Sequence, residues 1–450
     1  MISMNLLKNL SNIYLIKTMI STDFDKRRKF LLKKIHNDSA VIIFSEEEKT
    51  RNNDVTYKFR QSSNFFYLTG INSPKSALIM IKTKKNTSII LVSKKPNDFD
   101  KIWHGQVPSK QSIKRQYNIQ NVMYYDELNT LNLHDIKNIY FEFKDEHKLD
   151  LFLSDTNISE PTSRYKKNNN NKPSKIDLSS QIYEMRLIKS AHEISEIRHA
   201  ADISSKAHIN IMTSCKPGLT EYQIESNFIN YCMSNRCEQA YPAIVASGNN
   251  ACILHYTHNN STLRSNKLLL VDAAAEFNNY ASDITRTIPI SGKFNRYQRI
   301  IYNIVLKSQT MAINSCKPGK TLIDIHNVAV KYITKGLIDA KILNGNLEKN
   351  IQNETYKKYF MHNTGHWLGL DVHDPCPYVV NGKPVVLKPG MIFTVEPGIY
   401  INRDLTIDRG FHNIGIRIED DVLITKKGCD VLTKDVPKSV VDIENVMNNA

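Results

Sequence analysis

The chain has 450 residues, of which 41% are hydrophobic and 23% charged. These proportions are typical of a globular protein of two or three domains, and they exclude a disordered or fibrous chain. The net charge is +15, but no arginine-rich stripe alternates with aromatic residues, so we expect no nucleic-acid partner. No apolar stretch approaches the ~20 residues of a membrane span, so we expect no membrane association.

The first twenty residues contain two lysines, Lys8 and Lys17, and neither arginine nor an acidic residue. Their longest apolar run is too short for a secretory signal. We predict that translation begins at Met19 and that the protein is cytoplasmic; the alternative is a mitochondrial protein with residues 1–18 as its presequence. The seven cysteines all lie beyond residue 214 without Cys-x-x-Cys spacing, which favours a reducing compartment.

Residues 24–165 alternate helical and strand patterns. A helix is predicted over Lys26–Ile35, and apolar runs of strand length follow at Ala40–Phe44, Ala77–Ile81 and Ser88–Val92. This alternation predicts a small α/β domain at the N-terminus.

Residues 166–176 form the predicted linker, because Asn, Pro, Lys and Ser dominate there. A long helical pattern then runs from Ile182 to Met212. The rest of the chain, residues 177–450, is large enough to be an α+β catalytic domain.

This second domain contains a weak internal repeat. The tetrapeptide CKPG occurs at Cys215–Gly218 and again at Cys316–Gly319, followed by Thr220 and Thr321 at the same offset. Each copy lies between two helical patterns. The repeat predicts a duplicated unit of helices and sheet.

The segment Leu268–Ile290 predicts a hairpin that carries two aspartates. With Phe277 and Asn278 as the central turn residues, Asp272 lies directly opposite Asp283. Carboxylates in such a pair repel each other unless a cation or a shared proton neutralises them. The hairpin is therefore either a metal site or an exposed turn with two solvated acids, and the apolar residues around Asp272 favour burial.

Three of the 14 histidines, His362, His366 and His373, fall within twelve residues, in HNTGHWLGLDVHD. Imidazole is the commonest nitrogen ligand of metals and the side chain that transfers protons near neutral pH. The cluster therefore indicates a metal or proton-transfer site.

Two further carboxylates lie in predicted strands. Glu396 ends an apolar run and is followed by Pro-Gly, and Glu419 lies in the segment GIRIEDD. Strand alternation places Arg417 and Glu419 on one face. We expect Arg417 to hold Glu419 ionised and oriented; the alternative is an ordinary salt bridge within a strand.

Together these segments resemble the aminopeptidase P group of pita-bread-fold metallopeptidases, from about residue 25 onward. The matching segments, in the family's order and spacing, are RNNDVTYKFRQSSNFFYLTG, CILHYT, LLLVDAAAEFNNYASDITRT, HNTGHWLGLDVHD, TVEPGIYI and GIRIEDD. The resemblance implies a creatinase-like α/β N-terminal domain followed by an α+β pita-bread catalytic domain with an internal pseudo-duplication. That architecture also accounts for the repeated CKPG.

The resemblance implies a site for two divalent metal ions, with family ligands at Asp272, Asp283, His366, Glu396 and Glu419. In the family, the residues at Asp283 and Glu419 would bridge the two ions. Asp272 would complete the coordination of one ion, and His366 with Glu396 would complete that of the other. Such an oxygen-rich set suits manganese, although zinc, cobalt or iron could also bind.

The implied reaction is hydrolysis of the bond between an N-terminal residue and a proline at the second position of a peptide. Two close ions would lower the pKa of a bridging water and polarise the scissile carbonyl. His255, His362 and His373 match the family's outer histidines, which bind substrate, stabilise the tetrahedral intermediate and relay a proton to the leaving nitrogen. Arg417 joins them as a catalytic residue.

Three other functions are weighed against this one. A prolidase shares the fold and metals but cleaves only Xaa-Pro dipeptides. A methionine aminopeptidase lacks this N-terminal domain. A non-catalytic pita-bread binding module usually loses metal ligands, whereas all five residue types are present here.

Trp103, one of two tryptophans, resembles the tryptophan of the family's Trp-x-Gly segment. In bacterial members that segment lines the substrate pocket of a neighbouring subunit. We therefore expect a homo-oligomer, a tetramer or a dimer, whose active site is completed across a subunit boundary. The alternative is that Trp103 packs in the core of its own domain.

Overall fold

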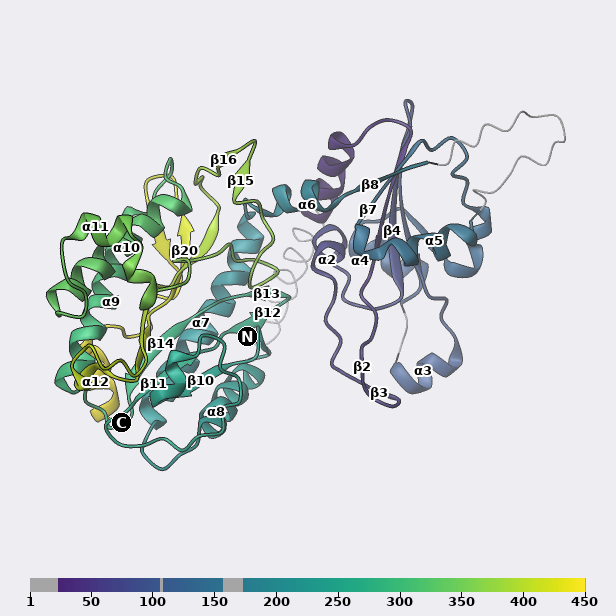
Figure 1. Cartoon of the computed structure of the whole chain (residues 1–450). Helices are drawn as coiled ribbons and strands as arrows, with labels where there is room; N and C mark the ends of the chain where they lie inside the picture. The colour runs from purple at the N-terminus through teal and green to yellow at the C-terminus, as the bar shows by residue number, and fades with distance from the viewer. Residues whose placement is uncertain (1–22, 106–107, 157–172, 450) are drawn as a thin grey trace, which may run out of the picture. The chain divides into compact units, whose positions relative to one another are not determined.

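The structure, a computed structural model, describes residues 23–105, 108–156 and 173–449 (Figure 1). The chain divides into two compact units, Met1–Met185 and Arg186–Ala450. The predicted start at Met19 and the alternative presequence of residues 1–18 lie outside the described residues, as does most of the predicted linker.

The first unit is built on one six-stranded sheet with strand order β6-β5-β4-β1-β7-β8. β1 is parallel to β7 and antiparallel to β4, and β5 is parallel to β6. The strands are β1 (Ser39–Phe44), β4 (Ser76–Lys82), β5 (Thr87–Ser93), β6 (Asn121–Tyr124), β7 (Asn138–Phe141) and β8 (Ser174–Asp177), with a small hairpin of β2 (Thr50–Asn52) and β3 (Val55–Thr56).

Helices accompany this sheet, and the predicted α/β character is confirmed. A helix over residues 23–34 precedes β1, and the others are α2 (Ser63–Thr69), α3 (Asp98–His104), α4 (Lys110–Tyr117), α5 (Glu146–Ser154) and α6 (Ser179–Arg186). All six residues of β1 are buried, as expected of a continuous apolar run inside a sheet. The three strands predicted from apolar runs correspond to β1, β4 and β5.

Two predicted features differ in the structure. Residues 174–176, assigned to the linker, belong to β8, which pairs with β7. The long helix predicted from Ile182 to Met212 is two helices, α6 and α7 (Ala191–Ser214). The break occurs because Ser190 and Glu193 form a capping box, in which each side chain accepts a hydrogen bond from the other's backbone amide.

The second unit has two halves, each with a pair of packed helices and an antiparallel sheet of three strands. The first contains α7, α8 (Glu221–Ser234), β10 (Ile244–Ser247), β11 (Leu268–Asp272) and β14 (Thr285–Pro289). The second contains α9 (Arg296–Ser315), α10 (Leu322–Asp339), β17 (Ile392–Val395), β20 (Asp420–Ile424) and β21 (Cys429–Val431). One continuous apolar core joins the halves.

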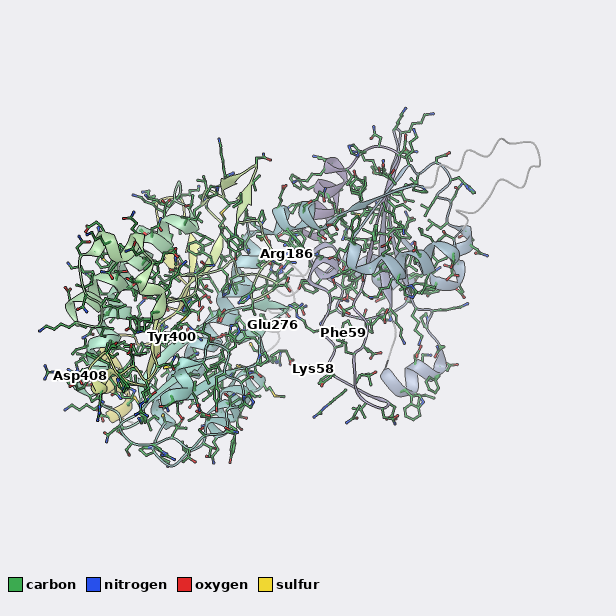
Figure 2. The ribbon with its side chains drawn as sticks, viewed as in Figure 1. Lys58, Phe59, Arg186, Glu276, Tyr400 and Asp408 are labelled. Carbon is green, nitrogen blue, oxygen red and sulfur yellow. The ribbon has the colours of Figure 1, made fainter. Side chains whose placement is uncertain are left out.

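Shorter elements complete this unit. They are β9 (Glu238–Gln239), β12 (Ala275–Phe277), β13 (Tyr280–Ala281), β15 (Val379–Val380), β16 (Lys383–Pro384), β18 (Gly398–Ile401), β19 (Ile414–Arg417), α11 (Leu347–Gln352) and α12 (Val440–Asn448). Figure 2 shows how side chains fill the space between these ribbons; the labelled Tyr400 is only 1% exposed.

The CKPG repeat has a structural counterpart. The amide of Gly218 donates to the carbonyl of Leu263 at 2.9 Å, and the amide of Gly319 donates to the carbonyl of Leu387 at 3.1 Å. In each half the tetrapeptide therefore links a helical hairpin to the chain that enters a strand of the sheet, β11 in the first half and β17 in the second. The predicted duplication is confirmed at the level of these hydrogen bonds.

The predicted register of the aspartate hairpin is wrong by two residues. Asn278 and Asn279 are the central turn residues, both with positive φ, as a two-residue type I′ turn requires. Asp272 consequently pairs with Thr285, and Asp283 lies two residues away on the same face. The two carboxylates still point to the same side of the sheet.

Candidate active site

A cavity of about 570 Å³ in the second unit is lined by all nine residues singled out from the sequence. Five are the predicted metal ligands and four the predicted catalytic residues: Asp272, Asp283, His366, Glu396, Glu419, His255, His362, His373 and Arg417. Residues that are far apart in the sequence thus meet in one place.

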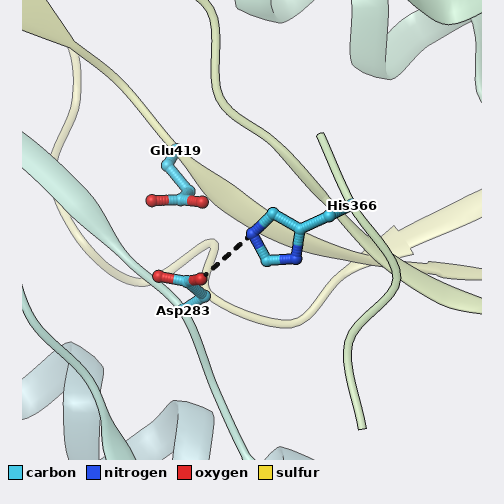
Figure 3. Close-up of side chains that lie close together, drawn as sticks. All are labelled: Asp283, His366 and Glu419. Carbon is cyan, nitrogen blue, oxygen red and sulfur yellow. Dashed lines mark ion pairs between the residues drawn. The ribbon is translucent and has the colours of Figure 1, made fainter. Parts of the chain in front are cut away.

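Three of the predicted ligands form a compact cluster (Figure 3). Asp283, His366 and Glu419 each offer a ligand atom, and these atoms lie within 4.8 Å of one another. His366 Nε2 lies 3.4 Å from Asp283 Oδ2 and 3.4 Å from Glu396 Oε1. The imidazole nitrogen therefore lies between two carboxylates, as it would in a shared metal site.

His366 is held against β17 by the backbone on either side of it. The amide of Thr394 donates to the carbonyl of His366 at 2.9 Å, and Trp367 forms a β-bridge with Phe393. A Cβ at Gly365 would lie 1.8 Å from the carbonyl oxygen of Thr394. Only glycine permits this close approach, so Gly365 places the imidazole beside Glu396.

Tyr241 joins the two aspartates of the hairpin. Its hydroxyl lies 2.6 Å from Asp272 Oδ1 and within hydrogen-bonding distance of Asp283 Oδ1. Burial and the charges of both aspartates raise the pKa of Tyr241 well above its usual value, so the hydroxyl keeps its proton. This contact draws both carboxylates toward one point.

Arg417 acts on Asp272 rather than directly on Glu419. One guanidinium nitrogen donates to Asp272 Oδ2, and another donates to the hydroxyl of Tyr400 at 3.0 Å. Nε donates to Thr285 Oγ1 at 3.0 Å, and that hydroxyl donates to Glu419 Oε2 at 2.6 Å. The predicted hold of Arg417 on Glu419 is therefore indirect, because Thr285, opposite Asp272, occupies the space between them.

Two of the outer histidines have defined surroundings. His362 Nδ1 donates to the carbonyl of Asn363 at 2.7 Å, so Nε2 accepts from the hydroxyl of Tyr400 at 2.9 Å. Burial, together with the charge of Arg417, lowers the pKa of His362 to about 4. The ring of His373 lies 4.1 Å from the ring of His366, between centroids.

Burial and mutual repulsion dominate the electrostatics of the carboxylates. Burial raises the pKa of Asp272, Glu396 and Glu419, and neighbouring carboxylates raise each of them further. Burial alone would lower the pKa of His366, but its hydrogen bond to Asp283 and the charge of Glu396 raise it to about 9. Buried carboxylates that repel one another favour a bound cation, so this donor set fits a divalent metal.

The sequence analysis missed Tyr241, Thr285 and Tyr400. Thr285 had a usable signal, since it lies two residues from Asp283 and so on the same strand face. Tyr241 has none, because it reaches the cavity from a part of the chain that holds no other site residue. Tyr400 lies four residues after Glu396, but its contacts with His362 and Arg417 depend on the tertiary structure.

The comparisons with known proteins agree with this site. The model of "Metallopeptidase family M24" matches residues 195–426, and that of "Aminopeptidase P, N-terminal domain" matches residues 24–139. A Xaa-Pro aminopeptidase of Haemophilus influenzae is 39% identical over 95% of this chain and 97% of its own, and one of Escherichia coli is 35% identical over 94% and 97%.

Solved structures give the same result. Proline aminopeptidase P II from Yersinia pestis matches with a TM-score of 0.89 at 35% identity, over 96% of this chain and 100% of its own. Aminopeptidase PepP of Pseudomonas aeruginosa matches with a TM-score of 0.90 at 35% identity, over 95% and 98%. Escherichia coli aminopeptidase P has been solved with the inhibitor Pro-Leu and, zinc-substituted, with product.

Fold and site together define a metal-dependent peptidase with a two-domain architecture. The chain belongs to metallopeptidase family M24, in its aminopeptidase P group. The predicted resemblance and the fold class, an α/β N-terminal domain followed by a pita-bread catalytic domain, are thereby confirmed. Among the described residues, no helix is long and apolar enough to cross a membrane.

Proposed function

We propose that this protein is a metalloaminopeptidase that hydrolyses the bond between an N-terminal residue and a proline at the second position of a peptide. The observation that supports this proposal is one cavity of the second unit in which four carboxylates and four histidines converge. The relatives named Xaa-Pro aminopeptidase, which align with nearly the whole chain, support this activity over that of a prolidase.

Five side chains would hold the metal: Asp272, Asp283, His366, Glu396 and Glu419. We propose two divalent ions, with Mn²⁺ as the native metal, because four carboxylates and one imidazole form an oxygen-rich set. Bound there, the ions supply an activated water and polarise the scissile carbonyl. The clustered ligand atoms of Asp283, His366 and Glu419 support this assignment.

The remaining cavity residues would act on the substrate. Neutral His362 has a fixed orientation, because Nδ1 donates to the carbonyl of Asn363 and Nε2 accepts from the hydroxyl of Tyr400, and it would line the substrate pocket in that orientation. His373, whose pKa burial lowers, is the candidate for transferring a proton to the leaving nitrogen. Arg417 donates a hydrogen bond to Asp272 and opposes the rise that burial causes in the pKa of this carboxyl. His255 lines the cavity from a separate loop.

Homo-oligomerisation is the second part of the proposal. Trp103 is 68% exposed, so it does not pack in the core of its own domain. Phe99 and Ile102, on the same helix α3, are 64% and 81% exposed. Exposed large apolar side chains in a group typically mark a contact surface, which supports a tetramer or dimer in which α3 meets another subunit.

The cellular compartment and the domain boundaries are further parts of the proposal. The cytoplasm is favoured by seven free cysteines, a usage typical of a reducing compartment. We keep residues 24–165 and 177–450 as the two domains, within which the family matches fall; of the predicted linker 166–176, residues 174–176 pair in the sheet of the first unit.

The activity is tested with purified protein by mass spectrometry. Tripeptides with proline at the second position, Xaa-Pro dipeptides and matched Xaa-Ala tripeptides are incubated with Mn²⁺ and after chelation. Release of the first residue from the Xaa-Pro tripeptides alone, lost on chelation and restored by Mn²⁺, is expected. Cleavage restricted to dipeptides would identify a prolidase, and no cleavage would favour a binding module.

A further inference from the structure

His255 lies on a segment with little regular structure of its own. Residues 247–261, here called the His255 loop, contain one short 3-10 turn, Gly248–Cys252, and are otherwise irregular. Leu254, His255 and Thr257 of this loop line the catalytic cavity. An irregular backbone keeps a single conformation only when partners outside it satisfy its polar groups.

One side chain accepts four hydrogen bonds from this loop. Glu221, the first residue of α8, is fully buried. Its Oε1 accepts from the amide of Ser247 at 2.7 Å and from Asn250 Nδ2 at 3.0 Å. Its Oε2 accepts from the hydroxyl of Tyr256 at 2.8 Å and from the amide of Ser261 at 2.9 Å.

These four hydrogen bonds span the whole loop. They begin at Ser247, where β10 ends, and finish at Ser261, and Tyr256 is the direct neighbour of His255. The amide of Glu221 also donates to the carbonyl of Ser261 at 3.0 Å. The N-terminus of α8 favours a negative charge at this position, so a buried carboxylate is well accommodated there.

Another part of the loop, its 3-10 turn, packs against the backbone of β19. A Cβ at Gly415, in β19, would lie 2.1 Å from the carbonyl oxygen of Ala251. The 3-10 turn is therefore pressed against β19 on one side and bound by Glu221 on the other. Little room is left for the loop to move as long as both contacts persist.

The second half of the domain shows that the fold itself does not need this carboxylate. Thr220 and Thr321 correspond, since each forms a β-bridge to the chain that leads into β11 or β17, Thr220 with Thr262 and Thr321 with Val386. The residue after Thr220 is Glu221, whereas the residue after Thr321 is Leu322. Leu322 lines a cavity of about 140 Å³ and makes no equivalent set of bonds among the described residues.

One helical turn further, the two halves agree again. Glu225 Oε2 accepts from Asn259 Nδ2 of the His255 loop at 2.9 Å. The corresponding His326 bonds through Nδ1 with Thr364 Oγ1 at 2.9 Å, next to the loop that carries His366. Both helical hairpins thus hold a histidine-bearing loop, and the first adds a buried carboxylate for this purpose.

We propose that Glu221 is a positioning residue for His255. It fixes the His255 loop so that the imidazole faces the cavity in the orientation that the bound peptide requires. The proposal rests on the proposed function in one respect, that His255 contacts the substrate.

The decisive variant is Glu221→Gln. Glutamine offers one acceptor oxygen in place of two, and its amide group would face two of the four donors. We expect kcat/KM for an Ala-Pro-Ala peptide to fall at least tenfold with bound metal unchanged, and hydrogen–deuterium exchange in residues 247–261 to accelerate. Tyr256→Phe, which removes one of the four bonds, should give a smaller loss in the same direction.

A double variant separates positioning from general stability. If Glu221 acts through His255, Glu221→Gln added to His255→Ala causes no further loss of kcat/KM, because the positioned group is already gone. Losses that multiply would overturn the proposal, as would wild-type kcat/KM in Glu221→Gln.

Glu444→Gln is the matched control. Glu444 also accepts from a backbone amide, that of Phe294, and from a side chain, that of Arg299, but in α12 and away from the cavity. The kcat/KM of the Glu444→Gln variant, and hydrogen–deuterium exchange in its His255 loop, should match those of the wild type. If the wild-type protein cleaves no Xaa-Pro peptide, the proposed function fails, and the exchange measurement alone then decides whether Glu221 holds the loop.

Discussion

Asp272 and Glu396 occupy corresponding positions in the two halves of the catalytic domain. Asp272 ends β11 and Glu396 directly follows β17. Each strand begins the same number of residues after a leucine, Leu263 or Leu387, that accepts a hydrogen bond from the glycine of its CKPG segment. The duplicated fold therefore delivers a carboxylate from an equivalent position of each half to the same cavity.

Asp283→Ala should abolish peptidase activity and lower the bound metal while leaving the fold intact. Asp283 belongs to the tight cluster with His366 and Glu419, and its removal also relieves repulsion among buried carboxylates. Metal analysis, activity and circular dichroism measure the three effects. Asp202→Ala, at a 47% exposed carboxylate, is the control; normal turnover in Asp283→Ala would refute the proposed metal site.

His373→Ala should lower kcat about 10²-fold or more, the scale of general acid–base catalysis. Its ring contacts that of His366 but is outside the ligand cluster, so metal content should stay near that of the wild type. Steady-state kinetics and metal analysis test this, with the exposed His134→Ala as control. Loss of metal from the His373 variant would make His373 a ligand and the assignment wrong.

Trp103→Ala should raise KM for peptides without unfolding the protein or releasing metal. The indole is exposed on α3, so its removal leaves the core of its own domain intact, and a rise in KM would report a contact between Trp103 and the bound peptide. Kinetics and light scattering are measured together, with Phe30→Ala, at another exposed aromatic residue, as the control. A fully active wild-type monomer would contradict the cross-subunit site.

His208 should make stability depend on pH. The side chain is 1% exposed, and Nε2 contacts the carbonyl of Ala273 at 2.8 Å. Burial is the main reason why its pKa falls to about 4. Below pH ~6.5 the unfolded chain takes up a proton that the folded chain does not, so stability is lost as the pH falls from ~6.5 toward ~4.

The full contribution of His208 over this interval is about 3 kcal/mol. The free energy of unfolding is measured by urea denaturation between pH 4.5 and 7 for the wild type and for His208→Gln. The difference between the two slopes against pH gives the contribution of His208, because the other titrating groups contribute equally to both. The wild type should lose more stability than the variant on acidification. Parallel curves would show that His208 titrates normally in the folded chain.

The sequence by itself determined that there are two domains, which segments form strands of continuous apolar residues, and which acidic residues and histidines line the candidate site, but not Tyr241, Thr285 or Tyr400. Each of these leaves a local signal. A buried strand needs an apolar run, and an aspartate such as Asp272 within leucine, valine and alanine is too costly to bury without a partner. Resemblance to a family then related the separate segments to one another.

Tertiary structure decided what depends on the meeting of distant segments. Two asparagines in the left-handed conformation moved the hairpin turn and gave Asp272 a different partner, Thr285. Arg417 consequently bonds to Asp272 and reaches Glu419 only through the threonine hydroxyl. Hydrogen bonds between segments far apart in the chain follow from packing, which fixes distances that no local sequence pattern encodes.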